Sequence, residues 1–427
     1  MSLPSNWASA SILTCGTFIR GVTYKKQEAS TTKKPGYTRL LRANNISNRN
    51  INTEEIVYVP LHNISETQIL QSGDILIATS SGSPSVVGKA AQIKNDTDMS
   101  FGAFCGVLRP YKNLNPEYIG HFFSSKQYRD RISKLARGTN INNIKQEHFE
   151  SIKIPIAPIN EQRRIADKLD RVLARVDAAN EHLSRVAPLI KRFRQSVLAA
   201  ATSGRLTEDW RKHDEYQTAT VRMDEIGKVS GGLTKNTKRA ELPLRKAYLR
   251  VANVYPNEVR LEDVLEIGLT ESEYEKTKLT YGDLLIVEGN GSIDQIGRGA
   301  MGKGELPECS HQNHLIRWRR SNLNIAPEFI LAYLMSPAGR KQIISAAGST
   351  SGLHTLSVSK ISALELNIPP LEEQTEIVRR VEKLFAFADR LEERLSQAQA
   401  AVQKLTPALL AKAFRGELVP QDPNDEP

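Results

Sequence analysis

An internal repeat constrains this sequence more than any other feature. Residues 158–162, Pro-Ile-Asn-Glu-Gln, recur as Pro-Leu-Glu-Glu-Gln at 370–374, and this offset of 212 continues without a gap as far as Leu206 and its counterpart Leu418. A repeat of this length indicates two copies of one structural unit. The chain is therefore expected to fold as two similar halves.

The segments upstream of these motifs repeat at an offset of 209. Residues 73–77, Gly-Asp-Ile-Leu-Ile, match Gly-Asp-Leu-Leu-Ile at 282–286, and Ala43-Asn44 matches Ala252-Asn253. We therefore predict the order domain, helix, domain, helix. The expected boundaries are a first domain at 1–153, a helical segment at 154–207, a second domain at 208–365, a second helical segment at 366–418 and a tail at 419–427.

The two helical segments carry apolar residues at alternating steps of three and four, which is typical of a coiled coil. Gly204 and Gly416 stand where a glycine would cap each helix at its C-terminus. Pro188 and Pro407 are expected to kink or locally break the helices. The residues predicted to pair the helices are Ile165, Leu169, Val176, Leu183, Ile190, Phe193, Ile377, Val381, Leu391, Leu395, Val402 and Leu405.

Chain connectivity sets the direction of the two helices. The first leads from domain one to domain two, and the second begins beside domain two, so pairing requires them to run antiparallel. This predicts a pseudo-two-fold dumbbell with one domain at each end. At 1.5 Å per residue, about 40 helical residues would span roughly 60 Å.

Each domain mixes short strand-like runs with turn residues. Residues 74–78 and 283–287 are the clearest strands. Helices are expected to begin at Pro116 and Pro327, because proline suits the first helical position. The predicted fold class is α+β, with two mixed α/β domains joined by two long helices.

The charge balance favours a polyanionic partner. The chain has 58 Lys and Arg against 48 Asp and Glu, a formal charge of +10 and a pI of about 9.3. Such an excess attracts nucleic acid or an anionic surface. Glycine- and serine-rich loops follow the two clearest strands, at 79–89 and 288–298. Their small residues let backbone amides approach phosphate, and their hydroxyl and amide groups can reach base edges.

These loops and the polar residues that lead into the strands form a candidate DNA-binding surface. The alternative is that glycine-serine stretches are ordinary turns. The candidate residues are Lys25, Lys26, Arg42, Asn44, Asn45, Ser81, Ser83, Lys89, Arg137, Asn140, Asn142, Asn143, Arg250, Asn253, Asn290, Ser292 and Arg298.

Two segments resemble catalytic motifs without completing them. Residues 82–89 resemble a phosphate-binding loop, but the glycines are too far apart and Ala90 replaces the required Ser or Thr. Residues 115–118 resemble the Asn-Pro-Pro-Tyr tetrapeptide of amino-methyltransferases, with Glu117 in place of the second proline. We therefore predict no catalytic residue and no cofactor on this chain.

The cysteine and apolar patterns bear on the compartment. Cys15, Cys105 and Cys309 are widely spaced, which fits a reducing cytoplasm. Cys309 lies near His311 and His314, but this spacing is too crowded for a usual zinc site, so no metal is expected. No apolar run reaches 18 residues and the N-terminus lacks a secretory signal. We expect a cytoplasmic protein with no membrane partner.

Two domains, each followed by a helix that opens with Pro-x-x-Glu-Gln, resemble the specificity subunits of type I restriction-modification systems. The closing motif Ala-Phe-Arg-Gly-Glu-Leu at 413–418 adds to the resemblance, which covers essentially the whole chain. Domain one is most similar to the type IA branch, through residues 20–26, 80–83 and 102–106. The first helix departs from the pattern, because its end at 201–206 lacks the aromatic residue seen at Phe414.

The resemblance implies a binding subunit without an active site. Each target-recognition domain would read one half of a bipartite double-stranded DNA target, and the helices would set the gap between the halves. Two modification (methyltransferase) subunits would bind the helices and supply S-adenosylmethionine chemistry. Restriction (translocase and nuclease) subunits would use ATP and Mg²⁺, so none of these cofactors is expected on this chain.

Two other function classes remain open at this point. A self-contained DNA methyltransferase or nuclease with attached recognition domains would bind S-adenosylmethionine or metal by itself. An adaptor scaffold built on a coiled coil would show no salt-dependent binding of DNA.

Overall fold

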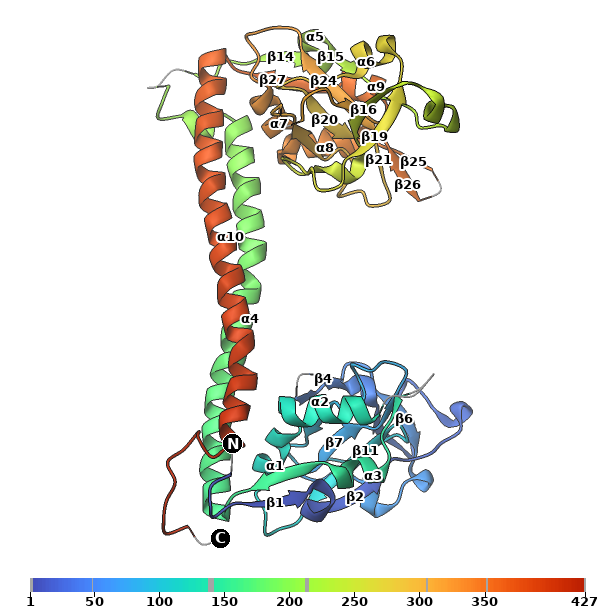
Figure 1. Cartoon of the computed structure of the whole chain (residues 1–427), viewed down its shortest axis with the longest axis vertical. Helices are drawn as coiled ribbons and strands as arrows, with labels where there is room; N and C mark the ends of the chain where they lie inside the picture. Colours follow the sequence, from blue (N-terminus) through green and yellow to red (C-terminus); the bar gives the residue numbers. More distant parts are fainter. Residues whose placement is uncertain are drawn as a thin grey trace. The chain divides into compact units, whose positions relative to one another are not determined.

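The computed structural model describes residues 3–47, 49–136, 142–211, 215–304, 306–350 and 352–425. The chain divides into two compact units. Unit 1 contains Met1–Ser184 and Ser396–Pro427, and unit 2 contains Arg185–Leu395. Most strands and helices occur in the same order in both units (Figure 1). Unit 2 has two further short α-helices, at Met223–Ile226 and Glu271–Thr277, and a further strand at Gly348–Thr350, which have no α-helical or strand equivalent among the described residues of unit 1.

Two long helices carry the repeated Pro-x-x-Glu-Gln motifs. Helix α4 spans Ile159–Thr202 and α10 spans Leu371–Ala413. Both run through their internal prolines, Pro188 and Pro407, so the predicted local break is wrong. The predicted caps are confirmed, because Gly204 and Gly416 adopt the left-handed conformation with φ of 75° and 76°.

The long helices run antiparallel where they pack together in each unit. In unit 1, Leu169 and Leu173 near the start of α4 share a core with Leu410 and Ala413 at the end of α10. In unit 2, Leu198 and Ala201 near the end of α4 share a core with residues at the start of α10. The start of one helix therefore meets the end of the other in both units.

The residues predicted to form the apolar seam that pairs the helices are buried or half-buried, with one exception. Leu405 is 45% exposed and does not belong to the seam. The buried or half-buried positions run through Val402, Thr406 and Leu410 instead, so Leu405 falls on the neighbouring face of α10.

Each domain is built on a four-stranded antiparallel sheet with the same strand order. Alternate residues of the central strand face two different cores: Ile75 and Ile77 pack toward the long helices, and Leu76 and Ala78 pack toward the second sheet. The strands of this sheet, in spatial order, are β2 (Gly16–Arg20), β11 (Cys105–Pro110), β7 (Ile75–Ala78) and β9 (Ala90–Gln92) in unit 1, and β15 (Gly227–Ser230), β24 (Leu315–Arg320), β20 (Leu284–Val287) and β22 (Gly299–Met301) in unit 2.

A three-stranded sheet lies beside the second core in each domain. Its strands are β10 (Ser100–Phe101), β3 (Tyr37–Leu41) and β6 (Val57–Pro60) in unit 1, and β19 (Leu265–Leu269), β16 (Leu244–Leu249) and β23 (Ser310–His311) in unit 2. Short pairs complete the domains: β1 (Ala8–Ser11) with β13 (Lys153–Ile156), β4 (Ile46–Ser47) with β5 (Asn50–Ile51), β8 (Ser80–Ser81) with β12 (Asn142–Asn143), β14 (Ala219–Arg222) with β27 (Glu365–Ile368), β17 (Val254–Tyr255) with β18 (Glu258–Val259), and the trio β21 (Gly289–Asn290), β26 (Leu353–Thr355) and β25 (Gly348–Thr350).

The short helices confirm the predicted proline starts. Helix α1 (Pro116–Phe122) and its counterpart α7 (Pro327–Met335) both have proline in the first turn, and the Asn115 side chain caps α1 by accepting from the Tyr118 amide at 2.7 Å. The remaining helices are α2 (Lys126–Leu135), α3 (Gln146–Ser151), α5 (Met223–Ile226), α6 (Glu271–Thr277), α8 (Pro337–Ala346) and α9 (Val358–Ser362). No helix in the described ranges is long and apolar enough to span a bilayer.

The Gln of each Pro-x-x-Glu-Gln motif joins the long helix to its domain. Gln162 accepts from the Asn115 amide at 2.9 Å and donates to the Ala157 carbonyl at 2.7 Å. In unit 2, Gln374 accepts from the Ala326 amide at 2.9 Å in the same way. The motif therefore fixes the start of α1 or α7 against the first turn of the long helix.

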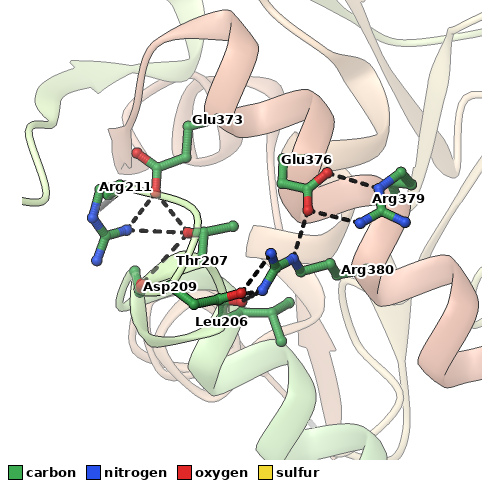
Figure 2. Close-up of polar contacts among 9 residues, drawn as sticks. Leu206, Thr207, Asp209, Arg211, Glu373, Glu376, Arg379 and Arg380 are labelled. Carbon is green, nitrogen blue, oxygen red and sulfur yellow. Dashed lines mark hydrogen bonds and ion pairs between the residues drawn. The ribbon is translucent and has the colours of Figure 1, made fainter. Parts of the chain in front are cut away.

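The Glu of each motif binds the segment that follows the other long helix. Glu373 is buried and accepts from the Thr207 hydroxyl at 2.6 Å and from the Arg211 guanidinium (Figure 2). Two turns further along α10, Arg380 bridges Glu376 and Asp209, with Nη1 2.5 Å from Asp209 Oδ1 (Figure 2). The link after α4 is therefore clamped to α10 within unit 2.

Unit 1 repeats this arrangement with the chain's last residues. Glu161 is fully buried and accepts from Trp7 Nε1 at 2.9 Å and from Gln421 Nε2 at 2.5 Å. Arg164 forms an ion pair with Asp425 at 2.5 Å. The tail after α10 thus occupies, on α4, the place that the link after α4 occupies on α10.

Candidate nucleic-acid interface

The glycine-serine loops are closed at their roots by backbone hydrogen bonds. In unit 1, the Gly88 amide donates to the Ala78 carbonyl and the Ala78 amide to the Lys89 carbonyl, both at 2.8 Å. In unit 2, the Gly297 amide donates to the Val287 carbonyl and the Val287 amide donates to the Arg298 carbonyl, both at 3.0 Å. Gly88 has a φ of 74°, and a Cβ there would lie 2.5 Å from Ile132. Each loop is therefore a shaped turn with defined ends.

An arginine from the second short helix of each domain donates hydrogen bonds to carbonyl groups of the loop. Arg129 of α2 donates to the carbonyls of Val87 at 2.9 Å and Ser85 at 3.2 Å. Arg340 of α8 donates to the carbonyls of Ile293 and Asp294 at 3.3 and 3.2 Å. Burial lowers the pKa of both guanidinium groups from the usual value. No local pattern in the sequence points to these residues, because the loop and the arginine are more than 40 positions apart.

A short strand supports the first loop from the side. Strand β12 pairs with β8, and the Asn142 side chain lies 3.4 Å from the carbonyls of Ser81 and Gly82. Asn142 is buried, whereas Asn143 is exposed. The candidates Arg137 and Asn140 lie outside the described residues.

Asn45 and Asn253 have structural roles, which corrects the prediction that they bind DNA. The Asn45 amide donates to the carbonyls of Asn52 and Glu55 at 2.8 and 3.0 Å, and its oxygen accepts from the Arg42 amide. Asn253 makes the equivalent three contacts, and both side chains are 2% exposed. All their hydrogen-bonding groups are occupied within the chain, so neither can read a base.

This equivalence also corrects the alignment of the two domains at this point. Asn45 corresponds to Asn253 at an offset of 208, so the exposed Asn44 corresponds to Ala252. The change from an offset of 208 here to 209 at residues 73–77 means that domain two has one more residue between these two points. This difference was not visible in the sequence, because Asn44 and Asn45 are identical neighbours.

Two of the basic candidates have side chains that already bind other groups of the chain. Arg298 donates to the carbonyls of Val254 and Val251 at 2.7 and 3.0 Å, and burial lowers the pKa of its guanidinium. Arg250 is paired with Asp263 at 2.7 Å. These two arginines therefore stabilise the structure of their own domain.

The other candidates lie at least partly at the surface. Ser81 Oγ accepts from the Ser83 amide at 3.2 Å, and Asn290 Oδ1 accepts from the Ser292 amide at 2.9 Å, so these side chains shape the loop tips. The exposed candidates are Lys25, Lys26, Asn44, Asn143 and Ser292, and the half-buried ones are Arg42, Ser81, Ser83, Lys89 and Asn290.

An open cleft lies between the domain and the long helices in each unit. In unit 1 a cleft of about 800 Å³ is lined by Lys89, Arg129 and the β4–β5 turn, together with Asp177 of α4. Arg49 in that turn pairs with Asp177 at 2.6 Å. In unit 2 the cleft is about 880 Å³ and is lined by basic residues that include Lys191, Arg194, Arg260, Arg298 and Arg340.

Cys105, Cys309 and His311 lie in the interior of the domains. Burial raises the pKa of the Cys105 and Cys309 thiols to about 12, so both stay protonated. His311 is fully buried, whereas His314 is exposed. Within the described ranges no group of three or more His, Cys, Asp or Glu side chains is placed to hold a metal ion.

Comparison with known proteins gives one consistent result. The family model for the type I restriction modification DNA specificity domain matches residues 4–186 and again 215–398. The chain is 42% identical to the Escherichia coli K12 type I restriction enzyme EcoKI specificity subunit, across 98% of this chain and 90% of that protein. It is 40% identical to the StySPI specificity subunit of Salmonella potsdam, with the same coverage.

Two solved structures share the fold. One is a chain from a study of complex assembly and conformational transition of the type I restriction-modification system, with a TM-score of 0.69 at 16% identity over 98% of this chain and 100% of that chain. The other is the HsdS subunit of Thermoanaerobacter tengcongensis, with a TM-score of 0.59 at 17% identity over 98% and 99% of the two chains. The twice-matched family model, together with relatives at 40% identity or more along nearly the whole chain, shows that this protein belongs to the family of type I restriction-modification DNA specificity subunits.

Proposed function

We propose that this chain is the non-catalytic DNA-recognition subunit of a type I restriction-modification complex. Each domain reads one half of a bipartite double-stranded target, and the long helices dock two modification subunits and set the gap between the half-sites. The modification subunits supply S-adenosylmethionine chemistry, and restriction subunits supply ATP- and Mg²⁺-dependent translocation and cleavage. The resulting complex is cytoplasmic.

One observation carries this proposal. The glycine-serine loop occurs in both domains with the same contacts. Equivalent backbone hydrogen bonds close its two ends, and an equivalent arginine, Arg129 in domain one and Arg340 in domain two, donates to its carbonyl groups. A loop that only connected two strands would not need this support in both domains. Loops on a rigid scaffold are the usual location of recognition residues.

The alternative of a self-contained methyltransferase is tested with the isolated chain. We expect the purified chain to bind no S-adenosylmethionine and to transfer no methyl group to DNA, and methylation to appear when modification subunits are added. Calorimetric titration with S-adenosylmethionine and a methyl-transfer assay measure both. Methyl transfer by the chain alone, free of partner subunits, would refute the proposal.

In the first domain, we expect one substitution to weaken binding to all DNA and another to weaken binding to the cognate half-site alone. Lys89→Ala should weaken binding to all duplexes and lower the salt dependence by about one unit of slope, because one phosphate contact is lost. Asn44→Ala should cost about 1–3 kcal/mol on the cognate half-site and nothing on unrelated DNA, if its amide contacts a base. Lys112→Ala is the charge-matched control, since Lys112 reaches the surface but follows the far end of β11.

These binding constants are measured for the complex with modification subunits over a range of salt. An unchanged affinity and salt slope for Lys89→Ala and Asn44→Ala would place the interface on another face of the domain. A loss with Lys112→Ala equal to that with Lys89→Ala would mean that only net charge matters.

The length of the long helices is expected to control the gap between the half-sites. Seven residues inserted in helical register into both α4 and α10 would lengthen each by about 10 Å, which corresponds to about three base pairs. The insertion belongs near residues 184 and 396, because the link beyond Gly204 is clamped to α10. Methylation mapping should then find a longer gap between unaltered half-sites. An unaltered gap, or a changed half-site, would contradict the prediction.

A further inference from the structure

The turn that precedes the central strand β11 is structurally equivalent to the turn that precedes β24. The Cys105 amide donates to the Gly102 carbonyl at 2.8 Å, and the Leu315 amide donates to the Gln312 carbonyl at 2.9 Å. The third residue of this turn is Phe104 in domain one and His314 in domain two. The two residues therefore occupy the same position in the repeat.

Both residues are fixed through their backbone to the start of the glycine-serine loop. The Phe104 carbonyl accepts from the amides of Thr79 and Ser80 at 2.9 and 3.1 Å. The His314 carbonyl accepts from the Glu288 amide at 3.0 Å. Thr79 and Glu288 are the first residues after the central strands β7 and β20. Each turn is thus joined to the root of its loop.

The side chains of both residues are directed to solvent although their backbones are fixed. Phe104 is 68% exposed, and the His314 side chain is 57% exposed. A single exposed apolar residue is common on protein surfaces and needs no explanation by itself. What distinguishes this position is that both repeats expose a large side chain at the same backbone-anchored point beside the loop.

We propose that Phe104 and His314 are the equivalent base-discriminating residues of the two domains, with Phe104 packing on a thymine methyl group and His314 accepting a hydrogen bond from a base amino group. This inference rests on the proposed function, because it assumes that the loops face DNA. The exchange of an apolar for a polar group at one position would let the two domains prefer different base pairs.

Phe104 suits thymine for a chemical reason. Its phenyl ring has no donor or acceptor, so it can distinguish bases in the major groove only through apolar contact, and the thymine methyl is the apolar group that base edges present there. The backbone that carries the ring is fixed by hydrogen bonds to Thr79 and Ser80, so the contact costs little ordering of the backbone.

His314 suits a base amino group because of its partner. Nδ1 lies 2.9 Å from Glu288 Oε2. An ionised carboxylate can only accept, so Nδ1 must carry the proton, and the Nε2 of the neutral ring is then an acceptor. In the major groove the donors are the amino groups of adenine and cytosine. Glu288 therefore sets which ring nitrogen is offered.

The test for Phe104 uses the complex with its modification subunits and its mapped target. Each thymine of half-site one, on either strand, is replaced in turn by uracil, which removes only the methyl group. We expect one replacement to weaken binding by the wild type about fourfold, the factor for losing one buried methyl group. Phe104→Ala should lose a similar factor on unmodified DNA and be insensitive to that replacement, while Phe104→Leu should keep part of the sensitivity.

The test for His314 uses half-site two in the same way. Purine replaces each adenine and 2-pyrimidinone each cytosine, which removes the amino group. We expect one position to weaken wild-type binding about fivefold, as for one hydrogen bond, and His314→Ala to be insensitive there. Tyr111→Ala and Leu323→Ala are the controls, because these exposed residues follow the far ends of β11 and β24 and should leave every factor unchanged.

The possible outcomes separate this inference from the proposed function. Sensitivity to one base analogue that disappears in the matching variant supports the inference. A half-site one with no thymine that responds, or the same response in Phe104→Ala as in the wild type, overturns it for Phe104, and the corresponding result overturns it for His314. A wild-type complex with no preference among duplexes would refute the proposed function itself, and the inference with it.

Discussion

Replacing Glu373 with alanine is expected to lower the free energy of unfolding of unit 2 by about 3–5 kcal/mol, the cost of removing one partner from a buried ion pair. The Glu373 side chain is 5% exposed and that of Arg211 is 11% exposed. Without the carboxylate, the Arg211 guanidinium remains in a buried site, where among the described residues the Thr207 hydroxyl lies at 3.1 Å and the ring of Tyr216 packs against it. The link between α4 and domain two would then lose one of its attachments to α10, while the contacts of Arg380 remain.

Hydrogen exchange measures this effect separately in each unit. Amides of β20 and β24 report on unit 2, and those of β7 and β11 in unit 1 serve as the internal reference. Arg379→Ala is the matched control on the same helix, because its side chain is 62% exposed and its solvent-screened pair with Glu376 should contribute little to stability. Equal protection in Glu373→Ala and Arg379→Ala would show that the buried pair does not stabilise the junction.

Lowering the pH from 7 to 4 is expected to remove about 3 kcal/mol of stability from unit 2 through His311 alone. Burial of the ring, assisted by the nearby Arg317, lowers the pKa of His311 from 6.5 to about 4. The unfolded chain therefore takes up a proton as the pH falls below 6.5, while the folded chain does not. This contribution to stability is complete above pH 6.5 and is lost progressively down to about pH 4.

Domain one supplies the control for this prediction. Phe101 occupies the position of His311, since each is the last residue of its short strand, β10 or β23. His311→Phe should therefore flatten the pH dependence of β20 and β24 exchange without affecting the amides of unit 1. A variant whose unit 2 loses as much stability between pH 6.5 and 4 as the wild type would contradict the prediction.

The architecture could be predicted because the features that define it are periodic or repeated. Two helices of more than 40 residues impose an apolar period that short-range chemistry cannot obscure, and Gly204 and Gly416 end them as expected. The predicted local break at the internal prolines was wrong, because packing of both long helices offset the loss of the hydrogen bond that each proline removes.

The candidate interface was less predictable, because its contacts depend on side chains far apart in sequence. Asn253 and Arg298 are of residue types that often bind DNA, yet both side chains form hydrogen bonds within their own domain. Arg129 and Phe104, which hold or flank the first loop, lie 25 or more positions beyond its start. Only the folded sheet brings them beside it.

The docking of the tail on Glu161 has a consequence for the order in which the protein can form. Unit 2 is one continuous stretch of chain, whereas unit 1 joins residues 1–184 to residues 396–427. During synthesis, domain one must wait for more than 200 further residues before Gln421 and Asp425 can reach Glu161 and Arg164. The domain that leaves the ribosome first is therefore the last to be completed, and until then its share of α4 exposes an apolar stripe to which chaperones can bind.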